Sequence, residues 1–421
     1  MAAERFLHLL RFYLPGGRVQ VLPDRDRIEG EGISPPSGNP AGCLRTGVLL
    51  GRIVTVITSY AVGLLLLGSC DPGSSEGVGV GERSTLQSSL RASPLSMSEA
   101  PLFTTDDLGH PILARPMSAA ESRAGIFAFA DASDNDIKLY GRDGKRVGTL
   151  GRSGQGPGEF LALTSAPFLR DSLFAFDFLT QRISVFDVAR SLDLNVPIPS
   201  GLDGMPMFLK SVDDSLLLSV GMAMSVPQGG NMATLLQADR SCCVSGMLEN
   251  RLSNPALIQS VVVLADARDG VVYGLVDDSL FAFDYGGRQV ASGKLPLELM
   301  PRSWASLLAE NDGQDQLVDG RSVFHGYHLP FAFVALDSGT VAVQSSRYDQ
   351  EIGIDIVDGG TVGLLAIDGR GGFTMLGSHE ASGGLLGRTA DGLPLIVSYA
   401  GNSDAYRVST LRLSALGSDG R

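Results

Sequence analysis

The sequence predicts an all-β protein built from repeated units of short strands. Of its 421 residues, 53 are glycine and only 19% are charged, which indicates many tight turns between strands. No long amphipathic helical pattern follows residue 100. Instead, apolar runs of strand length recur along the chain, at 125–131, 172–178, 215–221, 271–277, 340–346 and 393–399.

The spacing of these runs predicts how the strands are grouped. Their first residues are 47, 43, 56, 69 and 53 residues apart, and turn residues follow most of them. A period of about 40–55 residues with about four strands is typical of one β-propeller blade. We therefore expect a six-bladed β-propeller over residues 101–414 and a polar tail over 415–421. The competing fold is a pair of β-sandwiches, which would need no such repetition.

The last unit predicts how the ring closes. If each apolar run is the second strand of its blade, the last blade has only three strands by residue 414. Residues 101–108 are expected to supply the missing outer strand. Joining both ends of the domain in one blade would remove open sheet edges, which favour aggregation.

A hydrophobic segment near the N-terminus predicts export and membrane attachment. Residues 48–69 contain a basic residue, Arg52, then a 15-residue apolar stretch and two small residues before Cys70. The sequence Leu67–Cys70 resembles the lipobox of bacterial lipoproteins, in which the cysteine is acylated and anchors the mature chain. The alternatives are an uncleaved membrane helix or a plain cleaved signal. The apolar stretch is short for a span, which needs about 20 residues.

The segments on either side of this signal have different interpretations. Residues 1–47 lie upstream of the point where a signal should begin, so we interpret them as a non-native extension from a start assigned too early. Residues 71–100 contain 12 Gly or Ser in 30 and no aromatic residue. Such a composition cannot bury a core, so we assign 70–100 to a flexible tether.

The charge of the chain makes nucleic acid an unlikely class of partner. The formal net charge is −13, and from residue 70 onward 26 Lys and Arg face 41 Asp and Glu. A surface with this excess of negative charge repels phosphate backbones. We therefore expect contact with a membrane through the lipid, and no nucleic-acid partner.

One loop and two strand–turn patterns resemble a known family. The loop 151–160 resembles the G-x-x-G-x-GPGEF signature of bacterial six-bladed β-propeller proteins related to the NHL-repeat group. Residues 136–145 and 181–187 match the strand–turn pattern of that family. The matching signature residues are Gly151, Gly154, Gly156, Pro157, Gly158, Glu159 and Phe160. The resemblance implies an exported lipoprotein and a fold more than an activity, because propellers include both binders and enzymes.

The Gly-rich loop also permits a phosphate-binding interpretation, which the residues do not favour. The loop lacks the G-K-[ST] ending of a P-loop, and Pro157 removes one N–H donor. We interpret it as a tight turn between blades, with Phe160 packed between them. No cofactor is predicted.

Two groups of side chains are weak candidates for metal binding. Asp131, Asp134 and Asp136 could hold calcium, but the spacing of an EF-hand is absent and such residues are common in plain turns. His325 and His328 form an H-x-x-H pair that lacks a third zinc ligand nearby. We therefore assign no metal site.

The cysteines of the mature chain leave one open question. With Cys70 acylated, Cys242 and Cys243 remain as an adjacent pair in an oxidising compartment. They either form a strained vicinal disulfide, stay as thiols or pair with another chain. Titration of free thiols in the unfolded, unreduced domain distinguishes these states, because two thiols would exclude the disulfide.

Two classes of function remain open from the sequence. The first is a binding or scaffold module of the cell envelope, for a protein, peptide or glycan partner. The irregular segments 222–262 and 300–330 would surround its binding face, with Trp304, Tyr327 and His328 as contact residues. The other interpretation is that these segments are tolerated loop growth and that Trp304 packs in the core or between blades. The alternative is a metal-dependent hydrolase, similar to lactonases, or a lyase. That alternative predicts at least three carboxylates or imidazoles converging in the central channel.

Overall fold

The computed structural model describes residues 95–415 except for thirteen segments, namely 108–109, 111, 188–190, 198–205, 214, 221–232, 237–262, 277, 302–316, 319–320, 323–327, 348–358 and 402–404. All described residues belong to one of two compact units of the chain, and the other unit, Gly17–Ser84, lies outside them. The expected extension 1–47, the signal 48–69 and Cys70 therefore also lie outside the described residues. No helix long and apolar enough to span a membrane occurs among the residues described.

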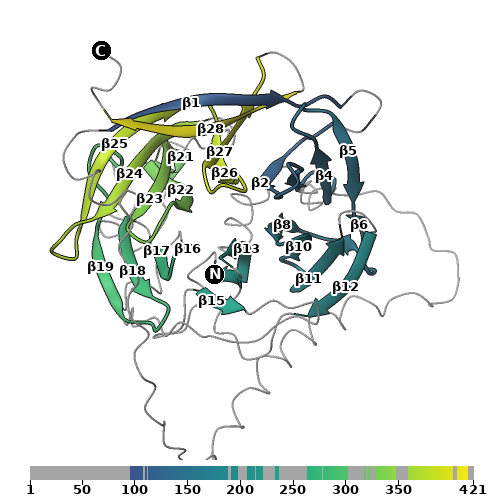
Figure 1. The fold of residues 1–421 in the computed structure, drawn as a ribbon, viewed down its shortest axis with the longest axis horizontal. Coiled ribbons are helices and arrows are strands. Elements are labelled where there is room, and N and C mark those ends of the chain that lie inside the picture. The colour runs from purple at the N-terminus through teal and green to yellow at the C-terminus, as the bar shows by residue number, and fades with distance from the viewer. Residues whose placement is uncertain are drawn as a thin grey trace, which may run out of the picture. The chain divides into compact units, whose positions relative to one another are not determined.

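The described part of the chain is all-β, as the sequence predicts, and its strands form antiparallel units arranged around a common centre (Figure 1). We name each unit by its first, innermost strand. The first unit consists of β2 (Pro116–Glu121), β3 (Phe127–Asp131), β4 (Asp136–Tyr140) and β5 (Arg146–Leu150). The second consists of β8 (Leu163–Ser165), β10 (Ser172–Asp177), β11 (Arg182–Asp187) and β12 (Ser191–Pro197), with β9 (Phe168–Leu169) beside β10. The third consists of β13 (Pro206–Val212), β14 (Ser215–Val220) and β15 (Ala233–Leu236).

The remaining units follow the same order from the centre outward. They are β16 (Val263–Arg268), β17 (Val271–Val276), β18 (Ser279–Asp284) and β19 (Gln289–Lys294); β22 (His328–Ala335), β23 (Thr340–Arg347), β24 (Gly360–Ile367) and β25 (Phe373–Ala381); and β26 (Gly384–Arg388), β27 (Pro394–Tyr399), β28 (Tyr406–Ala415) and β1 (Leu95–Thr104). Two short pairs complete the description, β6 (Arg152–Ser153) with β7 (Glu159–Phe160) and β20 (Leu317–Val318) with β21 (Arg321–Ser322).

Neighbouring units pack against each other in sequence order, and the last packs against the first. Shared hydrophobic clusters join the β2 and β8 units, the β13 and β16 units, the β16 and β22 units, and the β22 and β26 units. The β8 and β13 units are joined by hydrogen bonds, including one of 2.6 Å from Thr164 Oγ1 to the Met207 carbonyl oxygen. A further cluster joins the β26 unit to the β2 unit. This closed succession of radial sheets is a β-propeller.

Each apolar run of the sequence contains the second strand of its unit, namely β3, β10, β14, β17, β23 and β27. The reason is burial on both faces, because a second strand lies between two neighbouring sheets. All five residues of β3 are buried. The outer strand β5 instead alternates between half-buried and exposed residues. A continuous apolar run therefore identifies the second strand better than any other.

The signature loop 151–160 is a structural turn between the β2 and β8 units. Gly151 has a φ of 74°, and a side chain there would overlap the ring of Phe160. Phe160 is fully buried in the cluster that both units share. Glu159 accepts a hydrogen bond of 2.8 Å from the Gly156 N–H. Arg182 of β11 donates to carbonyl oxygens of the loop, at 3.1 Å to that of Gln155.

The outermost strand of the β26 unit comes from the N-terminal end of the domain. Strand β1 pairs antiparallel with β28, from Leu95 opposite Ala415 to Thr104 opposite Arg407. This strand starts before the expected range 101–108 and includes residues 95–100, which the sequence assigns to the tether. The reason is that Leu95 and Met97 are buried against the β22 and β26 units. A short apolar alternation in a polar segment is a weak signal without its partner strand.

Removing β1 is expected to weaken the whole ring. Deletion of residues 95–104 exposes the β28 edge and removes three buried side chains, Leu95, Met97 and Phe103. At about 1.5–3 kcal/mol for each buried side chain, the free energy of unfolding should fall by about 5 kcal/mol or more. The measurement is urea unfolding of the purified chain, with light scattering to detect association through the open edge. Deletion of the equally long tether segment 75–84 is the control, and equal effects of the two deletions would contradict this role of β1.

Candidate functional site: a central cavity with buried cations

A cavity of about 390 Å³ lies at the centre of the ring. Its walls come from the innermost strands β2, β8, β13, β16, β22 and β26, mostly from their C-terminal halves. The hairpin turns that follow these strands also contribute, including Arg170, Asp213 and Asp269, which have positive φ angles. The cavity therefore collects side chains from the whole length of the domain at one place.

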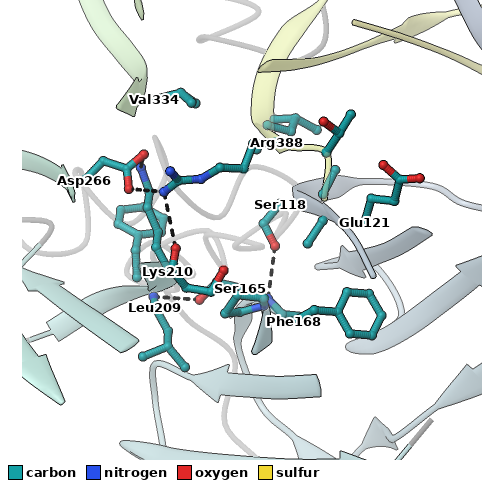
Figure 2. A pocket seen from close by; sticks show the side chains of 18 of the residues that line it. Ser118, Glu121, Ser165, Phe168, Leu209, Lys210, Asp266, Val334 and Arg388 are labelled. Carbon is teal, nitrogen blue, oxygen red and sulfur yellow. Dashed lines mark hydrogen bonds and ion pairs between the residues drawn. The ribbon is translucent and has the colours of Figure 1, made fainter. Parts of the chain in front are cut away.

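Asp266 of β16 is the central acidic group of this cavity (Figure 2). Only 1% of its side-chain surface is exposed. Its Oδ1 accepts a hydrogen bond of 2.9 Å from the Ala267 N–H and one of 2.6 Å from Arg388 Nη2. Its Oδ2 accepts a bond of 3.0 Å from the Ala335 N–H and lies 3.5 Å from Lys210 Nζ. Both oxygens are thus fully engaged, so Asp266 orders the site and is poorly suited to act as a base.

Arg388 reaches Asp266 because strand β26 approaches β2 very closely. The two strands pair in parallel, with Ala119 opposite Gly387 and Ala120 opposite Arg388. A β-carbon at position 387 would overlap the carbonyl oxygen of Ala119, so this approach requires glycine. The Arg388 guanidinium also donates to the carbonyl oxygens of Ala335 at 3.2 Å and Ser211 at 3.3 Å. It is therefore held in place from three neighbouring units.

Lys210 of β13 is the second cation at Asp266. Its Nζ donates a hydrogen bond of 2.7 Å to the Phe333 carbonyl oxygen and lies 5.9 Å from the centre of the Phe333 ring. Burial lowers the pKa of the Lys210 amine; the Asp266 carboxylate opposes this effect and the nearby Arg388 charge adds to it. The side chain keeps 29% of its surface exposed while lining the cavity. A lowered pKa means that this site disfavours the charged form of the amine relative to water.

Positive charge exceeds negative charge around the cavity, although the chain as a whole carries −13. The described lining includes five cations, Arg123, Arg170, Lys210, Arg268 and Arg388, and four anions, Glu121, Asp213, Asp266 and Asp269. Two of the anions have partners outside the lining. Glu121 binds Arg142 Nη2 at 2.7 Å, and Asp213 accepts a bond of 2.7 Å from the Tyr285 hydroxyl. The Lys210–Asp266–Arg388 cluster itself has two basic groups and one acidic group.

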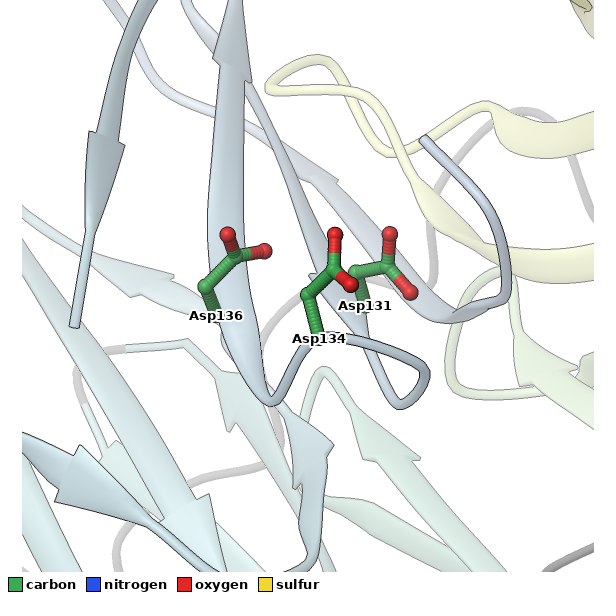
Figure 3. A group of neighbouring side chains, drawn as sticks. All are labelled: Asp131, Asp134 and Asp136. Atoms are coloured by element: carbon green, nitrogen blue, oxygen red, sulfur yellow. The ribbon is translucent and has the colours of Figure 1, made fainter. Parts of the chain in front are cut away.

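The three aspartates suggested as a calcium site lie elsewhere, around the turn between β3 and β4, and their carboxylates face the same way (Figure 3). A protein cation already lies among them. The ammonium of Lys138, fully buried, forms ion pairs with Asp131, with Asp134 at 2.5 Å and with Asp136 at 3.6 Å. The Lys138 Nζ also donates to the Ile112 carbonyl oxygen at 2.7 Å. A calcium ion would have to displace this ammonium, so the geometry supports a structural cluster.

Asp131 also fixes the backbone that leads into β2, and an aspartate of the next unit has the same role. Its carboxylate accepts hydrogen bonds from the Ala114, Arg115 and Ser133 N–H groups, at 2.8, 3.0 and 2.9 Å. Asp177, at the same end of β10, accepts the corresponding bonds from the N–H groups of Leu161, Ala162, Leu179 and Thr180. In both units an aspartate at the end of the second strand fixes the segment that leads into the first strand.

Of the remaining candidates from the sequence, His328 is the one that lies among the described residues. His328 is half-buried at the start of β22, opposite Arg347. Trp304, Tyr327, Cys242 and Cys243 lie outside the described residues, as do His325 and most of the insertions 222–262 and 300–330. Their proposed roles in partner contact or disulfide formation remain predictions.

The channel pattern expected of a metal-dependent enzyme is not found among the described residues. Within them, Asp131, Asp134 and Asp136 are the sole group of three potential ligands close enough to share an ion, and none of these lines the cavity. Three of the four described acids of the cavity, Glu121, Asp213 and Asp266, instead contact arginine, lysine, tyrosine or backbone N–H groups. No observation on this part of the chain favours the enzyme alternative.

The cluster of Lys210, Asp266 and Arg388 was missed by sequence analysis. A signal for it exists, because each residue is an ionisable side chain in a short apolar strand: MFLKSV, VLADAR and GLLGR. Each of these strands precedes the apolar run that identifies a second strand. A charged side chain on an innermost strand can reach solvent only in the central channel. For this physical reason, such a residue is a candidate for a central site.

Comparison with known proteins gives structural similarity alone. No family model matches the sequence, and no curated protein matches it. A presumed exported protein of Bacteroides fragilis is 12% identical over 76% of this chain and 95% of its own, with a TM-score of 0.48. A DUF4221 family member from Bacteroides vulgatus is 8% identical over 77% and 100%, with a TM-score of 0.47. A streptogramin B lyase is 10% identical over 76% and 98%, with a TM-score of 0.37. These low values carry no functional argument.

Substitution of Lys138 is expected to destabilise the domain far more than substitution of an exposed lysine. Lys138→Met leaves three carboxylates without their cation and should cost about 3–5 kcal/mol, as for other broken buried ion pairs. The control is Lys294→Met, because Lys294 is 71% exposed in its pair with Asp278; this change should cost at most about 1 kcal/mol. Urea unfolding at neutral pH measures both, and equal costs would contradict the structural assignment.

The Lys138→Met variant should also differ from the wild-type chain in how its stability depends on alkaline pH. The carboxylates raise the pKa of Lys138 above the ordinary lysine value of 10.5, against the effect of burial. A raised pKa stabilises the fold fully below pH 10.5 and loses that contribution as the pH rises through the folded-state value. The wild-type chain should therefore lose stability above that pH with a lysine contribution of about 1.4 kcal/mol per pH unit. Lys138→Met should lack this contribution, and Lys294→Met should retain it.

Proposed function

We propose that this chain is an exported, lipid-anchored, six-bladed β-propeller that binds a partner through the face on which the central cavity opens. The partner is an envelope protein, a peptide or a glycan. The observation that carries this proposal is the cavity itself, an ordered cluster of charges enclosed by apolar walls at the centre of a rigid ring. Pockets that combine apolar walls with a few fixed polar groups are typical of binding sites.

The blade count is supported by the strand order. Six sequence-consecutive units each begin at the cavity and proceed outward, and the β13 unit has three strands among the described residues. The parallel pairing of β26 with β2 brings the last unit against the first. A ring of six such units has its loops at two ends, where growth of the chain is tolerated without loss of the sheets.

Export and anchoring rest on the sequence of residues 48–70. If Cys70 carries lipid, 25 residues separate the membrane surface from Leu95, where β1 begins. A flexible segment of that length spans roughly 25–30 Å on average. The propeller would then stand close to the membrane and keep freedom to turn its cavity toward a partner.

Binding is preferred to catalysis because of how the charged groups of the cavity are used. A general base or metal ligand needs free lone pairs. The Asp266 oxygens already accept hydrogen bonds from two N–H groups and from Arg388, and Oδ2 also forms an ion pair with Lys210. Such a saturated group stabilises fixed positions for Lys210 and Arg388. Fixed cations suit recognition, since little ordering cost remains when a partner arrives.

Membrane attachment should depend on Cys70 alone among the cysteines near the signal. In a bacterial host, Cys70→Ser should abolish labelling with a palmitate analogue and move the protein from the detergent phase to the aqueous phase. Cys43→Ser is the matched control, because Cys43 precedes the signal and should be absent from the mature chain. Lipid labelling that survives Cys70→Ser, or a mature protein that begins at Met1, would contradict this part of the proposal.

Partner contact should be confined to the mouth of the cavity. A photoreactive phenylalanine analogue at Ala390, an exposed residue of the cavity lining, should form a discrete covalent adduct in native membranes. The same analogue at Val147, which is 58% exposed on the outer strand β5, should form none. Electrophoresis of the cross-linked membranes detects the adducts. No adduct from position 390, or equal adducts from both positions, would reject the cavity face as the binding surface.

A further inference from the structure

The central cluster contains two cations and one anion. Asp266 balances one positive charge, and Lys210 and Arg388 supply two. Removing an unmatched charge from bulk water is unfavourable unless a counter-charge accompanies it. The lowered pKa of Lys210, caused by burial and by Arg388 against the effect of Asp266, is consistent with this imbalance. When Lys210 is protonated, the cluster therefore carries one more positive than negative charge.

The two cations also keep donors that the described part of the chain does not use. A lysine ammonium has three N–H donors; Lys210 donates one hydrogen bond to the Phe333 carbonyl oxygen and forms an ion pair of 3.5 Å with Asp266. A guanidinium has five, and three contacts of Arg388 are found, to Ala335, Ser211 and Asp266. Each group therefore has more N–H donors than its described contacts use, and both residues line the cavity.

We propose that the cavity binds a carboxylate carried on a compact apolar body, with the carboxylate between Lys210 and Arg388. This inference rests on the proposed function and specifies the chemistry of its ligand. The carboxylate supplies the balancing negative charge and accepts hydrogen bonds from both cations. Hydrogen bonds between ionised partners are stronger than those between neutral groups. The planar guanidinium of arginine can also bind a planar carboxylate through two parallel hydrogen bonds.

The charge of the site favours a carboxylate over a phosphate. One negative charge brings the cluster to neutrality, whereas a phosphate dianion would leave an excess of negative charge beside Asp266. That carboxylate is 1% exposed and its position is fixed by N–H groups of Ala267 and Ala335. Repulsion from it would be weakly screened in such a buried position.

The walls and the volume of the cavity define the rest of the ligand. Apolar side chains line much of it, among them Phe208, Leu264, Phe331, Val334 and Leu385. At about 390 Å³ the cavity is at the small end of the range for ligand pockets. It can hold a small aryl or alkyl carboxylic acid, or the last residue of a peptide with its free C-terminal carboxylate. The shared chemistry is a carboxylate next to an apolar group.

Calorimetry on the full chain in detergent tests this inference with paired probes. The probes are phenylalkanoates from benzoate to 5-phenylpentanoate, linear alkanoates of similar length, and tripeptides ending in Phe or Leu, each with its primary amide. At least one carboxylate should bind, and its amide should bind about 10- to 100-fold more weakly, because the charge-assisted bonds are lost. Binding by free acids or by peptides alone identifies the source of the carboxylate and supports the inference either way.

One variant and its control test whether this binding depends on Lys210. Lys210→Met should weaken carboxylate binding by about tenfold or more and leave amide binding unchanged. Lys294→Met, outside the cavity, should leave both unchanged. If Lys210→Met does not fold, the comparison of carboxylate with amide on the wild-type chain decides. Equal affinity for acid and amide, tighter binding of inorganic phosphate, or no binding of any carboxylate overturns the inference. Continued cross-linking from position 390 in that case would leave the proposed function standing.

Discussion

Closure of the ring is the constraint on which the rest of this structure depends. Each radial sheet buries its faces against its neighbours, so a missing contact anywhere would expose two apolar faces. Closure is achieved twice in one unit, by β1 pairing with β28 at the outside and by β26 pairing with β2 at the centre. The second pairing requires Gly387, because any side chain there would overlap the backbone of β2.

Closure of the ring also creates the cavity that the central charged side chains line. Lys210 and Arg388 are 178 residues apart in the chain, yet both contact Asp266. None of the three would be acceptable inside a sheet-to-sheet core. They lie on innermost strands, where the neighbouring space is a cavity instead of another sheet. The ring therefore converts isolated polar residues of separate strands into one ordered, cationic site.

Two lysines, Lys138 buried and Lys210 half-buried, show how context decides the role of one residue type. Lys138 lies among three carboxylates, and these raise its pKa despite burial. Lys210 shares a single carboxylate with an arginine, and burial lowers its pKa. The first lysine is fully compensated and holds a turn in place. At the second, burial outweighs the effect of the single carboxylate, and the side chain lines the cavity.

The sequence by itself determined the all-β class, the repeat of strand units and the position of the second strand in each, because burial on both faces demands a continuous apolar run. It also identified the loop 151–160 as a turn. Three of its glycines have positive φ angles, and this requirement arises within the loop itself. Only the tertiary structure decided the start of β1, the role of Asp131 and the central cluster. Each of these depends on a partner from a distant segment: β28 for β1, the strand-entry backbone at Ala114 for Asp131, and three separate innermost strands for Asp266. Local patterns can mark such residues but do not identify their partners, because ring closure alone brings the partners together.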